Sequence, residues 1–282
     1  MVRATPPQIT VSPGDIVTFD LHDSSGGQVT PAATTSSFAS LDLSTFDPIF
    51  GPVAVSGAVP GDVLQIEILS LTTSGWGFTG IIPGFGLLSD EFPNHVLKHY
   101  TWAPDATHIA FAPGIRIPLR PFLGWAGIAP AEDGDFSTIP PLETGGNMDC
   151  RHITQGTKLY LPGDGEVCGT AIETPMKAAL RFTIRKDMPY VTSPHYDTRG
   201  SVHGGVQTDP AVYAVLGIDS DLLEASRKAL RSLIAHLVVT RGLEREEAYM
   251  LCSVAADLRI AEAVDMPNFA VAASLPYSVF EQ

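Results

Sequence analysis

Three glycine-rich stretches hold most of the acidic and amide side chains that could do chemistry in this 282-residue chain. In chain order, these side chains are Asp23, Gln28, Asn147, Asp149, Asp164 and Glu166. Glycine beside a carboxylate allows the backbone to approach a ligand closely. Asp164 and Glu166 are two residues apart, so in a strand both would project from the same face. Because like charges at short range repel, paired carboxylates indicate either a bound divalent cation or a shared proton.

Some of these residues also fit a purely structural role. Asp15 and Asp62 each follow Pro-Gly, where an aspartate hydrogen-bonds to its own turn, and Asp164 follows the same dipeptide. Asp164 therefore fits a turn about as well as a ligand set. Glu166 is the stronger candidate, because it would lie inside a strand. A lone His152 is more often a hydrogen-bonded structural histidine than a ligand.

The cysteines offer a different chemistry. Cys150 is followed by Arg151 and His152, and Cys168 lies just after the third glycine-rich stretch. A nearby base or positive charge can activate a thiolate nucleophile, although a buried and inert cysteine is the more common outcome. The chain has no Gly-x-Ser-x-Gly elbow, no phosphate-binding glycine loop and no His-Glu-x-x-His motif. A cysteine nucleophile thus stays open as an alternative to a metal site.

The elements that would position these residues are mostly strands. Gly and Pro, 26 and 23 in number, are spread along the chain, which is typical of many short strands with tight turns. The patterns predict strands at 16–21, 63–68, 115–119 and 269–275, a helix capped by Asp219 or Ser220 and ended by Gly242, and a second helix from about Glu244. We therefore expect a mainly β fold with a smaller α/β C-terminal part (α+β).

No stretch of linker composition divides the chain, so we expect a single unit over residues 1–282. Within it, residues 1–215 are expected to be β-rich and residues 216–282 to form the α/β closing part.

Composition limits the partners and the compartment. Asp and Glu number 31 against 17 Lys and Arg, a net charge of −14. Such a surface repels phosphate backbones and anionic lipid, so we expect neither a nucleic-acid partner nor a membrane partner. There is no signal-like apolar stretch at the start and no apolar run of membrane-spanning length. Three sparse cysteines give no disulfide framework, and the expected location is the cytoplasm.

Several strings together resemble the acetamidase/formamidase family, in the family's own order. They are residues 23–28, 82–88, Gly145-Gly146-Asn147-Met148-Asp149, the run from Gly163-Asp164-Gly165-Glu166 to Glu173, and residues 247–253. The resemblance covers about residue 8 to the C-terminus. The two glycine-rich acidic strings are specific, and the last string is supportive.

The resemblance implies hydrolysis of short linear amides, of the formamide or acetamide type, to a carboxylate and ammonia. It also implies a β-rich fold, a homo-oligomer, a small neutral amide as substrate and a divalent metal ion, with zinc as the first choice and calcium as the second. The acidic pattern of the family falls on Asp23, Asp149, Asp164 and Glu166, and its amides fall on Gln28 and Asn147. We expect Asp23, Asp149 and Glu166 to bind the metal. Asp164, Glu166 and Asn147 are the expected catalytic residues, and Gln28 and His152 the expected substrate-binding ones.

One departure from the family lies before Gly163. The family is expected to have a further stretch there, with an additional Gly-Asp and a His, whereas here Leu159-Tyr160-Leu161-Pro162 runs directly into Gly163. Loss of that stretch could remove a metal-binding or catalytic histidine. Two alternatives to a metal-assisted amidase therefore stay open: an amidase with a cysteine nucleophile, and a catalytically impaired, oligomeric binding homologue.

Overall fold

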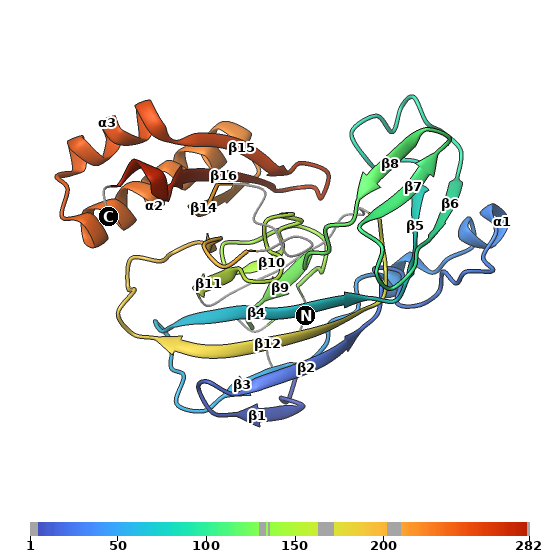
Figure 1. Ribbon diagram of the computed structural model, residues 1–282, viewed down its shortest axis with the longest axis horizontal. Helices are drawn as coiled ribbons and strands as arrows, with labels where there is room; N and C mark the ends of the chain where they lie inside the picture. The colour runs from blue at the N-terminus through green and yellow to red at the C-terminus, as the bar shows by residue number, and fades with distance from the viewer. Residues whose placement is uncertain (1–4, 130–133, 135, 163–171, 202–209, 281–282) are drawn as a thin grey trace.

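An eight-stranded antiparallel sheet forms the centre of the protein, in the order β15-β16-β14-β13-β11-β4-β12-β2. The computed structural model describes residues 5–129, 134, 136–162, 172–201 and 210–280. In sheet order, the strands are β15 (Asp257–Glu262), β16 (Phe269–Pro276), β14 (Val212–Asp219), β13 (His195–Asp197), β11 (Lys158–Pro162), β4 (Val63–Thr73), β12 (Met176–Arg185) and β2 (Ile16–Leu21). Strands from both ends of the chain therefore share one sheet, as Figure 1 shows.

The β2, β4 and β12 end of this sheet is built from alternating sequences. In β2, residues alternate between exposed and half-buried positions, and Val17, Phe19 and Leu21 turn toward the main hydrophobic core. Met176 of β12 pairs with Leu21 of β2 on one side and with Thr73 of β4 on the other. This alternation is what a strand with one buried face requires.

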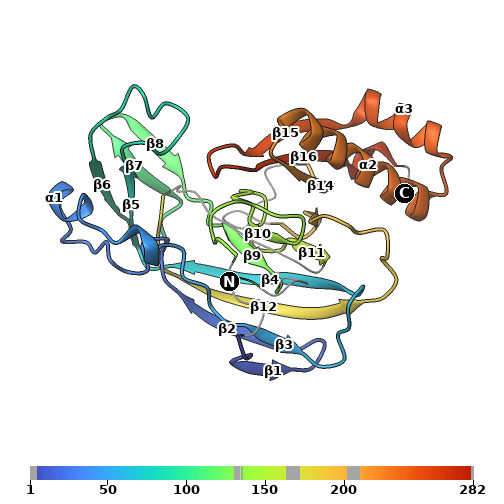
Figure 2. The same ribbon diagram turned by 180° about the vertical axis from the view of Figure 1, so that it is seen from behind.

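Four two-stranded sheets lie around this end of the large sheet (Figures 1 and 2). They pair β1 (Ile9–Val11) with β3 (Val53–Val55), β5 (Trp76–Ile81) with β6 (Val96–Thr101), β7 (His108–Ala112) with β8 (Ile115–Pro118), and β9 (Trp125–Gly127) with β10 (Gly145–Asn147). Only the first of these pairs is parallel. The third glycine-rich stretch lies outside the described residues, and the second forms β10 and the turn after it.

The helices are few. They are α1 (Thr35–Phe38), α2 (Leu222–Arg241) and α3 (Arg245–Ala255), with 3₁₀ turns at Leu43–Thr45 and Tyr277–Val279. Helix α2 packs on β14 and β16, where Leu233 and Leu237 enter a second core with Val215 and Leu275. Within the described residues, no helix is both long enough and apolar enough to cross a membrane.

The predicted fold class is confirmed, since the structure is mainly β with a small helical part. The predicted strand at residues 16–21 is β2, and α2 ends at Gly242 in the left-handed conformation, as expected. The predicted cap of α2 is wrong. Asp221 caps the helix by accepting a 2.8 Å hydrogen bond from the Glu224 N–H, whereas Asp219 accepts from the Asp221 N–H.

The boundary expected at residue 215 falls inside β14. Because β14 pairs with β13 on one side and β16 on the other, the large sheet continues without a break through this point. The closing part is therefore an extension of the same sheet, covered by α2 and α3.

Candidate functional site

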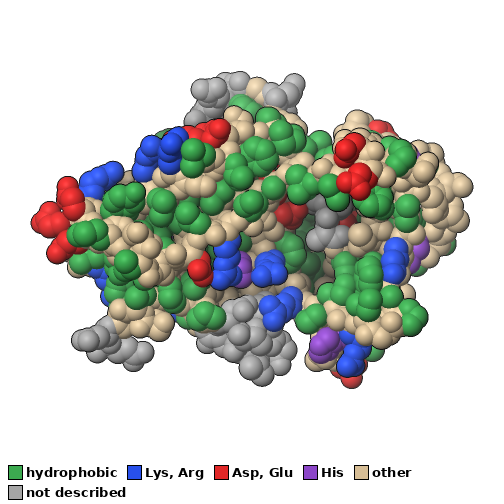
Figure 3. Space-filling model, turned by 90° about the horizontal axis from the view of Figure 1, so that it is seen from above, with side chains coloured by type: hydrophobic (Ala, Val, Ile, Leu, Met, Phe, Trp, Pro, Cys, Tyr) green, Lys and Arg blue, Asp and Glu red, His purple; other side chains and the backbone are tan. Residues whose placement is uncertain are grey.

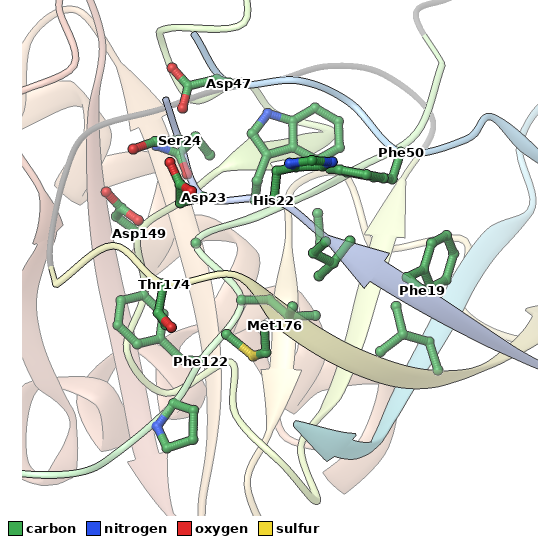
Figure 4. Close-up of a pocket in the computed structure, with 18 of the residues that line it drawn as sticks. Phe19, His22, Asp23, Ser24, Asp47, Phe50, Phe122, Asp149, Thr174 and Met176 are labelled. Carbon is green, nitrogen blue, oxygen red and sulfur yellow. The ribbon is translucent and has the colours of Figure 1, made fainter. Parts of the chain in front are cut away.

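A cavity of about 670 Å³ lies over the β2, β4 and β12 end of the large sheet. Its floor comes from these three strands, and its wall includes residues of β7, β8, β9, the loop after β10, and the segments 22–24, 47–53, 119–124 and 172–174. Seen from above, the molecule is hollowed between the α2–α3 part and the β5–β8 part, and acidic side chains are visible there (Figure 3). In the close-up, Asp23, Asp47 and Asp149 gather at one side of the cavity, while Phe19 lies well away from them (Figure 4).

Asp23 reaches the cavity from the turn that follows β2. Its Oδ1 accepts a 2.9 Å hydrogen bond from the Ser25 N–H and a short one from the Ser25 hydroxyl, and Gly26 closes the turn through the Asp23 carbonyl at 2.9 Å. The side chain is buried. Its other oxygen, Oδ2, is also buried and has no hydrogen-bond partner among the residues that the structure describes. A buried acceptor without a partner is costly unless a ligand or a proton satisfies it.

Asp149 reaches the same cavity from the turn after β10, held by an unusual backbone. Its φ is 36°, and among the described residues only one other non-glycine residue, Asp47, has a positive φ. Both are acidic and both line the cavity. The Asp149 N–H donates to the Gly124 carbonyl at 3.2 Å, which fixes the turn against the segment that precedes β9. Uncommon backbone conformations are found disproportionately at functional sites.

The glycines around Asp149 are explained by close backbone approach. A β-carbon on Gly145 would lie 2.4 Å from the Ala126 carbonyl oxygen, and one on Gly124 would lie 2.5 Å from the Asp149 Oδ1. Only glycine lets these two segments approach so closely. The Gly-Gly-Asn-Met-Asp string thus marks a place where β9 and β10 hold a carboxylate against the backbone.

Two further carboxylates lie behind Asp149, at the end of β15. Asn147, the last residue of β10, points its Nδ2 at the Asp265 Oδ2, 3.5 Å away. The Glu262 Oε1 accepts hydrogen bonds from the Val264 N–H and, at 2.7 Å, from the Asp265 N–H. Asn147, Glu262 and Asp265 are all buried. The Asp265 Oδ1 and the Glu262 Oε2 have no hydrogen-bond partner within the described part of the chain.

This crowding raises the pKa of several carboxyl groups. Burial, reinforced by the negative charge of Glu173, holds the pKa of Asp149 well above its usual range. Burial, followed by the charges of Glu262 and Asp149, raises the pKa of Asp265 to about 10. Burial also raises the pKa of Glu262. Like charges in a low-dielectric site cannot all ionise, so part of this cluster is protonated at neutral pH unless a cation is bound.

The predicted site residues separate into three sets. Asp23, Asn147 and Asp149, which are far apart in sequence, all line the cavity. Gln28 and His152 do not: the Gln28 amide holds its own loop, donating to the Asp42 carbonyl and the Thr45 hydroxyl, and His152 stacks on Tyr196. The expectation that Gln28 and His152 contact a substrate therefore finds no support in the geometry.

Asp164 and Glu166, and with them Cys168, lie outside the described residues. Their predicted roles stay predictions.

Sequence reasoning missed four acidic residues at or behind the cavity, namely Asp47, Glu173, Glu262 and Asp265. Glu173 lies inside a family-like string, which was a usable signal. Glu262 and Asp265 come from the end of an edge strand, far from any glycine-rich stretch, so nothing in their local pattern sets them apart. Only the long-range packing of β10 beside the β15–β16 loop brings them to Asn147.

Cys150, the other predicted nucleophile, is buried and does not line the cavity. Burial raises the pKa of its thiol to about 11, so the thiol form dominates at neutral pH. The positive charge of Arg151 acts in the opposite direction but is the weakest of the influences on this group. Such a thiol is a poor nucleophile.

A divalent cation is compatible with the donors present at the cavity. Asp23 offers an oxygen without a hydrogen-bond partner among the described residues, and burial together with the charge of Glu173 disfavours the ionised form of Asp149. Carboxylate and amide oxygens suit hard cations. Within the described residues, however, no three His, Cys, Asp or Glu side chains lie close enough to form a ligand set by themselves. The third predicted ligand, Glu166, is not among those residues.

The chain is similar to known proteins along nearly its whole length. The sequence profile of the acetamidase/formamidase family matches residues 3–135 and 163–282. The formamidase of Methylophilus methylotrophus is 23% identical over 363 residues, which cover 96% of this chain and 86% of the relative. The solved acetamidase from Bacillus halodurans is 27% identical with a TM-score of 0.83, covering 99% of this chain and 95% of that one. An acetamidase structure from Yersinia enterocolitica is 26% identical with a TM-score of 0.81, covering 99% and 88%.

The predicted resemblance is thereby confirmed. The alignment with the formamidase, 363 residues long, exceeds the 282 residues of this chain, so this chain lacks internal positions that the relative has. A missing stretch before Gly163 would produce such a difference.

Proposed function

This chain belongs to the acetamidase/formamidase family, and from that premise we propose that it hydrolyses the C–N bond of short linear amides to a carboxylate and ammonia. The expected enzyme class, an amidase, is confirmed at the level of the family, whose members compared above are a formamidase and acetamidases. The observation that carries the proposal for this chain is the convergence of Asp23, Asn147 and Asp149 on one cavity.

The site offers what amide cleavage demands. An amide needs an activated water, a polarised carbonyl and a proton for the departing nitrogen. While no cation is bound, the raised pKa favours protonated Asp149, which can then donate that proton, whereas a bound cation would keep Asp149 ionised as a ligand. The Asp23 Oδ2, which has no hydrogen-bond partner in the described part of the chain, can accept a proton from water or a hydrogen bond from the substrate NH₂ group. We assign the Asn147 amide, which hydrogen-bonds to Asp149, to orienting the substrate carbonyl.

We further propose that a divalent cation, zinc or calcium, assists the reaction, with Asp23, Asp149 and Glu166 as its ligands. When bound, such an ion would supply Lewis acidity and lower the pKa of a water molecule. Asp164 is proposed as a further ligand or as the general base. Support for the cation comes from the Asp23 oxygen that has no partner among the described residues and from the buried Asp149 carboxylate, rather than from a complete ligand set.

The test measures ammonia release from formamide, acetamide and longer amides before and after chelation, and then in Asp149→Asn and Glu166→Gln variants. Asp20→Asn is the matched control, because Asp20 is an exposed residue of β2 paired only with Lys177 in the described structure. We expect both site variants to lose at least 100-fold in turnover and the control to keep its rate. Unchanged turnover after chelation and in both site variants would exclude this assignment.

The alternative of a non-catalytic homologue rests on the internal positions that this chain lacks relative to the formamidase. It predicts tight binding of short amides with no release of ammonia. The same screen of amides, read by calorimetry and by ammonia release together, separates the two.

We also propose self-association, with β15 and α3 at the contact. Strand β15 is an edge of the large sheet and exposes Leu258 and Ile260, and α3 exposes Met250 and, at 83%, Val254. Exposed apolar edge strands are natural pairing surfaces. Sedimentation of the chain and of a Leu258→Lys, Ile260→Lys variant tests this: a monomer in both would exclude it.

A cytoplasmic location is proposed on the strength of the cysteines. Cys150 and Cys252 are free, buried thiols, which suits a reducing compartment. Cell fractionation with a reporter-tagged chain is the check, and recovery in a secreted or membrane fraction would contradict it.

A further inference from the structure

The cavity is far larger than formamide or acetamide requires. A non-hydrogen atom of a small molecule needs at most the ~30 Å³ that one water molecule takes in the liquid, so acetamide, with four such atoms, needs at most about 120 Å³. The cavity volume of about 670 Å³ lies instead in the range typical of sites for ligands several times larger.

The part of the cavity away from the carboxylates is apolar. Its lining side chains there come mainly from β2 and β12 of the large sheet, with Phe122 from the segment before β9, and include Phe19, Leu21, Phe122, Met176, Leu180 and Phe182. Phe19 and Phe182 touch edge to face, with ring centroids 6.4 Å apart, so this wall is a packed aromatic surface. Contact between an apolar wall and water costs free energy, and a bound hydrocarbon group would remove that contact.

The polar and apolar parts are continuous. Thr174 and Met176 are two residues apart on one segment, and Figure 4 shows Thr174 and Met176 between the Asp149 side of the cavity and Phe19. An amide group at Asp23 and Asp149 would therefore direct its acyl chain along Met176 toward Phe19. The lining residues include one Lys or Arg, Arg120, which is exposed.

From this geometry we infer that the preferred substrates are primary amides whose acyl part is an apolar chain of about four to six carbons, rather than formamide or acetamide. The inference rests on the proposed amide hydrolysis and adds the class of acyl group. The acyl chain of the substrate packs against the wall formed by Phe19, Met176 and Phe182, and its burial adds binding energy that formamide cannot supply.

The first experiment measures kcat/KM for ammonia release along the series formamide, acetamide, butanamide and hexanamide. Burial of each methylene favours the longer amide roughly fourfold, so kcat/KM should rise on the order of 100-fold from acetamide to hexanamide. A flat or falling series would overturn the inference and leave the proposed hydrolysis intact. The monoamide of adipic acid, with a terminal carboxylate, should be a poorer substrate than hexanamide. If it is the better one, recognition of charge through Arg120 replaces recognition of an apolar chain.

Two variants of β2 locate the effect. Phe19→Asn makes the cavity wall polar, whereas Ile16→Asn makes the same change on the same strand at an exposed position that does not line the cavity. We expect Phe19→Asn to lower kcat/KM for hexanamide at least tenfold and for acetamide less than threefold, and Ile16→Asn to leave both unchanged. If Phe19→Asn lowers kcat/KM equally for both amides while its melting temperature is unchanged, the placement of the acyl chain against Phe19 is overturned.

A second measurement separates this inference from the proposed function. If no amide releases ammonia, the proposed hydrolysis fails. Titration calorimetry with hexanamide and acetamide then tests whether the cavity binds an apolar acyl chain. Binding of hexanamide at least tenfold tighter than acetamide would support an apolar acyl site, and equal or absent binding of hexanamide would overturn it.

Discussion

Gly124 and Asp149 lie so close together that a β-carbon on Gly124 would stand 2.5 Å from the Asp149 Oδ1. The same β-carbon would lie 3.3 Å from the Asn147 Oδ1. The obstacle is the end of a side chain and not a backbone atom, so the carboxylate can swing away while the fold remains. A single glycine thus sets the position of a carboxylate that the proposed reaction uses.

The first prediction concerns this glycine. Gly124→Ala should displace the Asp149 carboxylate and lower kcat for amide hydrolysis by at least tenfold, because a misplaced catalytic group loses rate steeply. The melting temperature should change little. Gly134→Ala is the control, since a β-carbon there meets only ordinary contacts with Phe136. Full activity in Gly124→Ala would show that the position of Asp149 does not matter.

A second prediction concerns Asp265, whose pKa burial raises to about 10. When the pKa of a carboxyl is higher in the folded than in the unfolded state, the protein becomes less stable as pH rises. Here the loss extends over the interval from about 4 to about 10. Asp265→Asn mimics the protonated form and should remove that loss. Melting curves should therefore show the variant equal to the wild type near pH 4 and more stable near pH 9. A variant that is less stable at pH 9 would contradict the assignment.

A third prediction concerns acid stability, through the buried His195 and the half-buried His236, which pack in the second core. Burial lowers the pKa of His195 to about 3 and that of His236 to about 4, and the only other contribution for His195 comes from His236. The Tyr213 hydroxyl lies 2.8 Å from the His195 Nδ1, and the Tyr213 ring stacks on His236 at 3.6 Å. The charges of Arg241, Asp197 and Arg199 also act on His236.

Because both pKa values are lowered, the two neutral histidines contribute their full stability to the fold above the unfolded pKa of about 6.5. This contribution is lost as pH falls from there through about 4 and 3. Melting temperature should fall between pH 6.5 and pH 4. His236→Phe keeps the stack on Tyr213 and should make that fall shallower. A variant with the same acid profile as the wild type would show that other groups control it.

A fourth prediction addresses the cysteine alternative. Cys150→Ala should keep at least half of the wild-type rate of ammonia release, because the thiol is buried, is protonated and does not line the cavity. Treatment of the wild-type protein with N-ethylmaleimide at neutral pH, which is not a primary amide, should likewise leave the rate unchanged. Complete loss of activity in a folded Cys150→Ala protein would restore the thiol mechanism.

A fifth prediction concerns the helical cover of the sheet. A β-carbon on Gly217 of β14 would lie 2.0 Å from the Ala225 carbonyl oxygen and 2.3 Å from the Ala229 nitrogen of α2. These are backbone atoms, so the helix must move. Gly217→Ala should lower the free energy of unfolding by about 1–3 kcal/mol, as overpacking does. Denaturant titration measures it, and a loss below about 0.5 kcal/mol would contradict the close helix–strand packing.

Local pattern was enough for the class of fold and for many of its elements. The apolar alternation of residues 16–21 and 63–68, and the helical spacing before Gly242, are properties of neighbouring residues, and β2, β4 and α2 follow from them. The cap of α2 was misplaced by one or two residues because three polar residues, 219–221, each suit that position.

The glycine-rich strings in the sequence also identified Asp23, Asn147 and Asp149, since a carboxylate packed against backbone needs glycine nearby. They could not show that the Gln28 amide makes its hydrogen bonds within its own loop, because its partners, Asp42 and Thr45, are fourteen and seventeen residues away. Glu262 and Asp265 were equally invisible. Their pKa values depend on burial beside β10, which is a contact across more than a hundred residues.

Local strings of residues were sufficient for the family, the mainly β class and three carboxylate- or amide-bearing positions, because each of these depends on residues that are close together along the chain. Long-range packing controls which of those positions share a cavity, how large and how apolar that cavity is, and which distant acids raise the pKa of Asp149. These properties depend on distances between segments, and such distances are set only when the eight strands pair in their particular order.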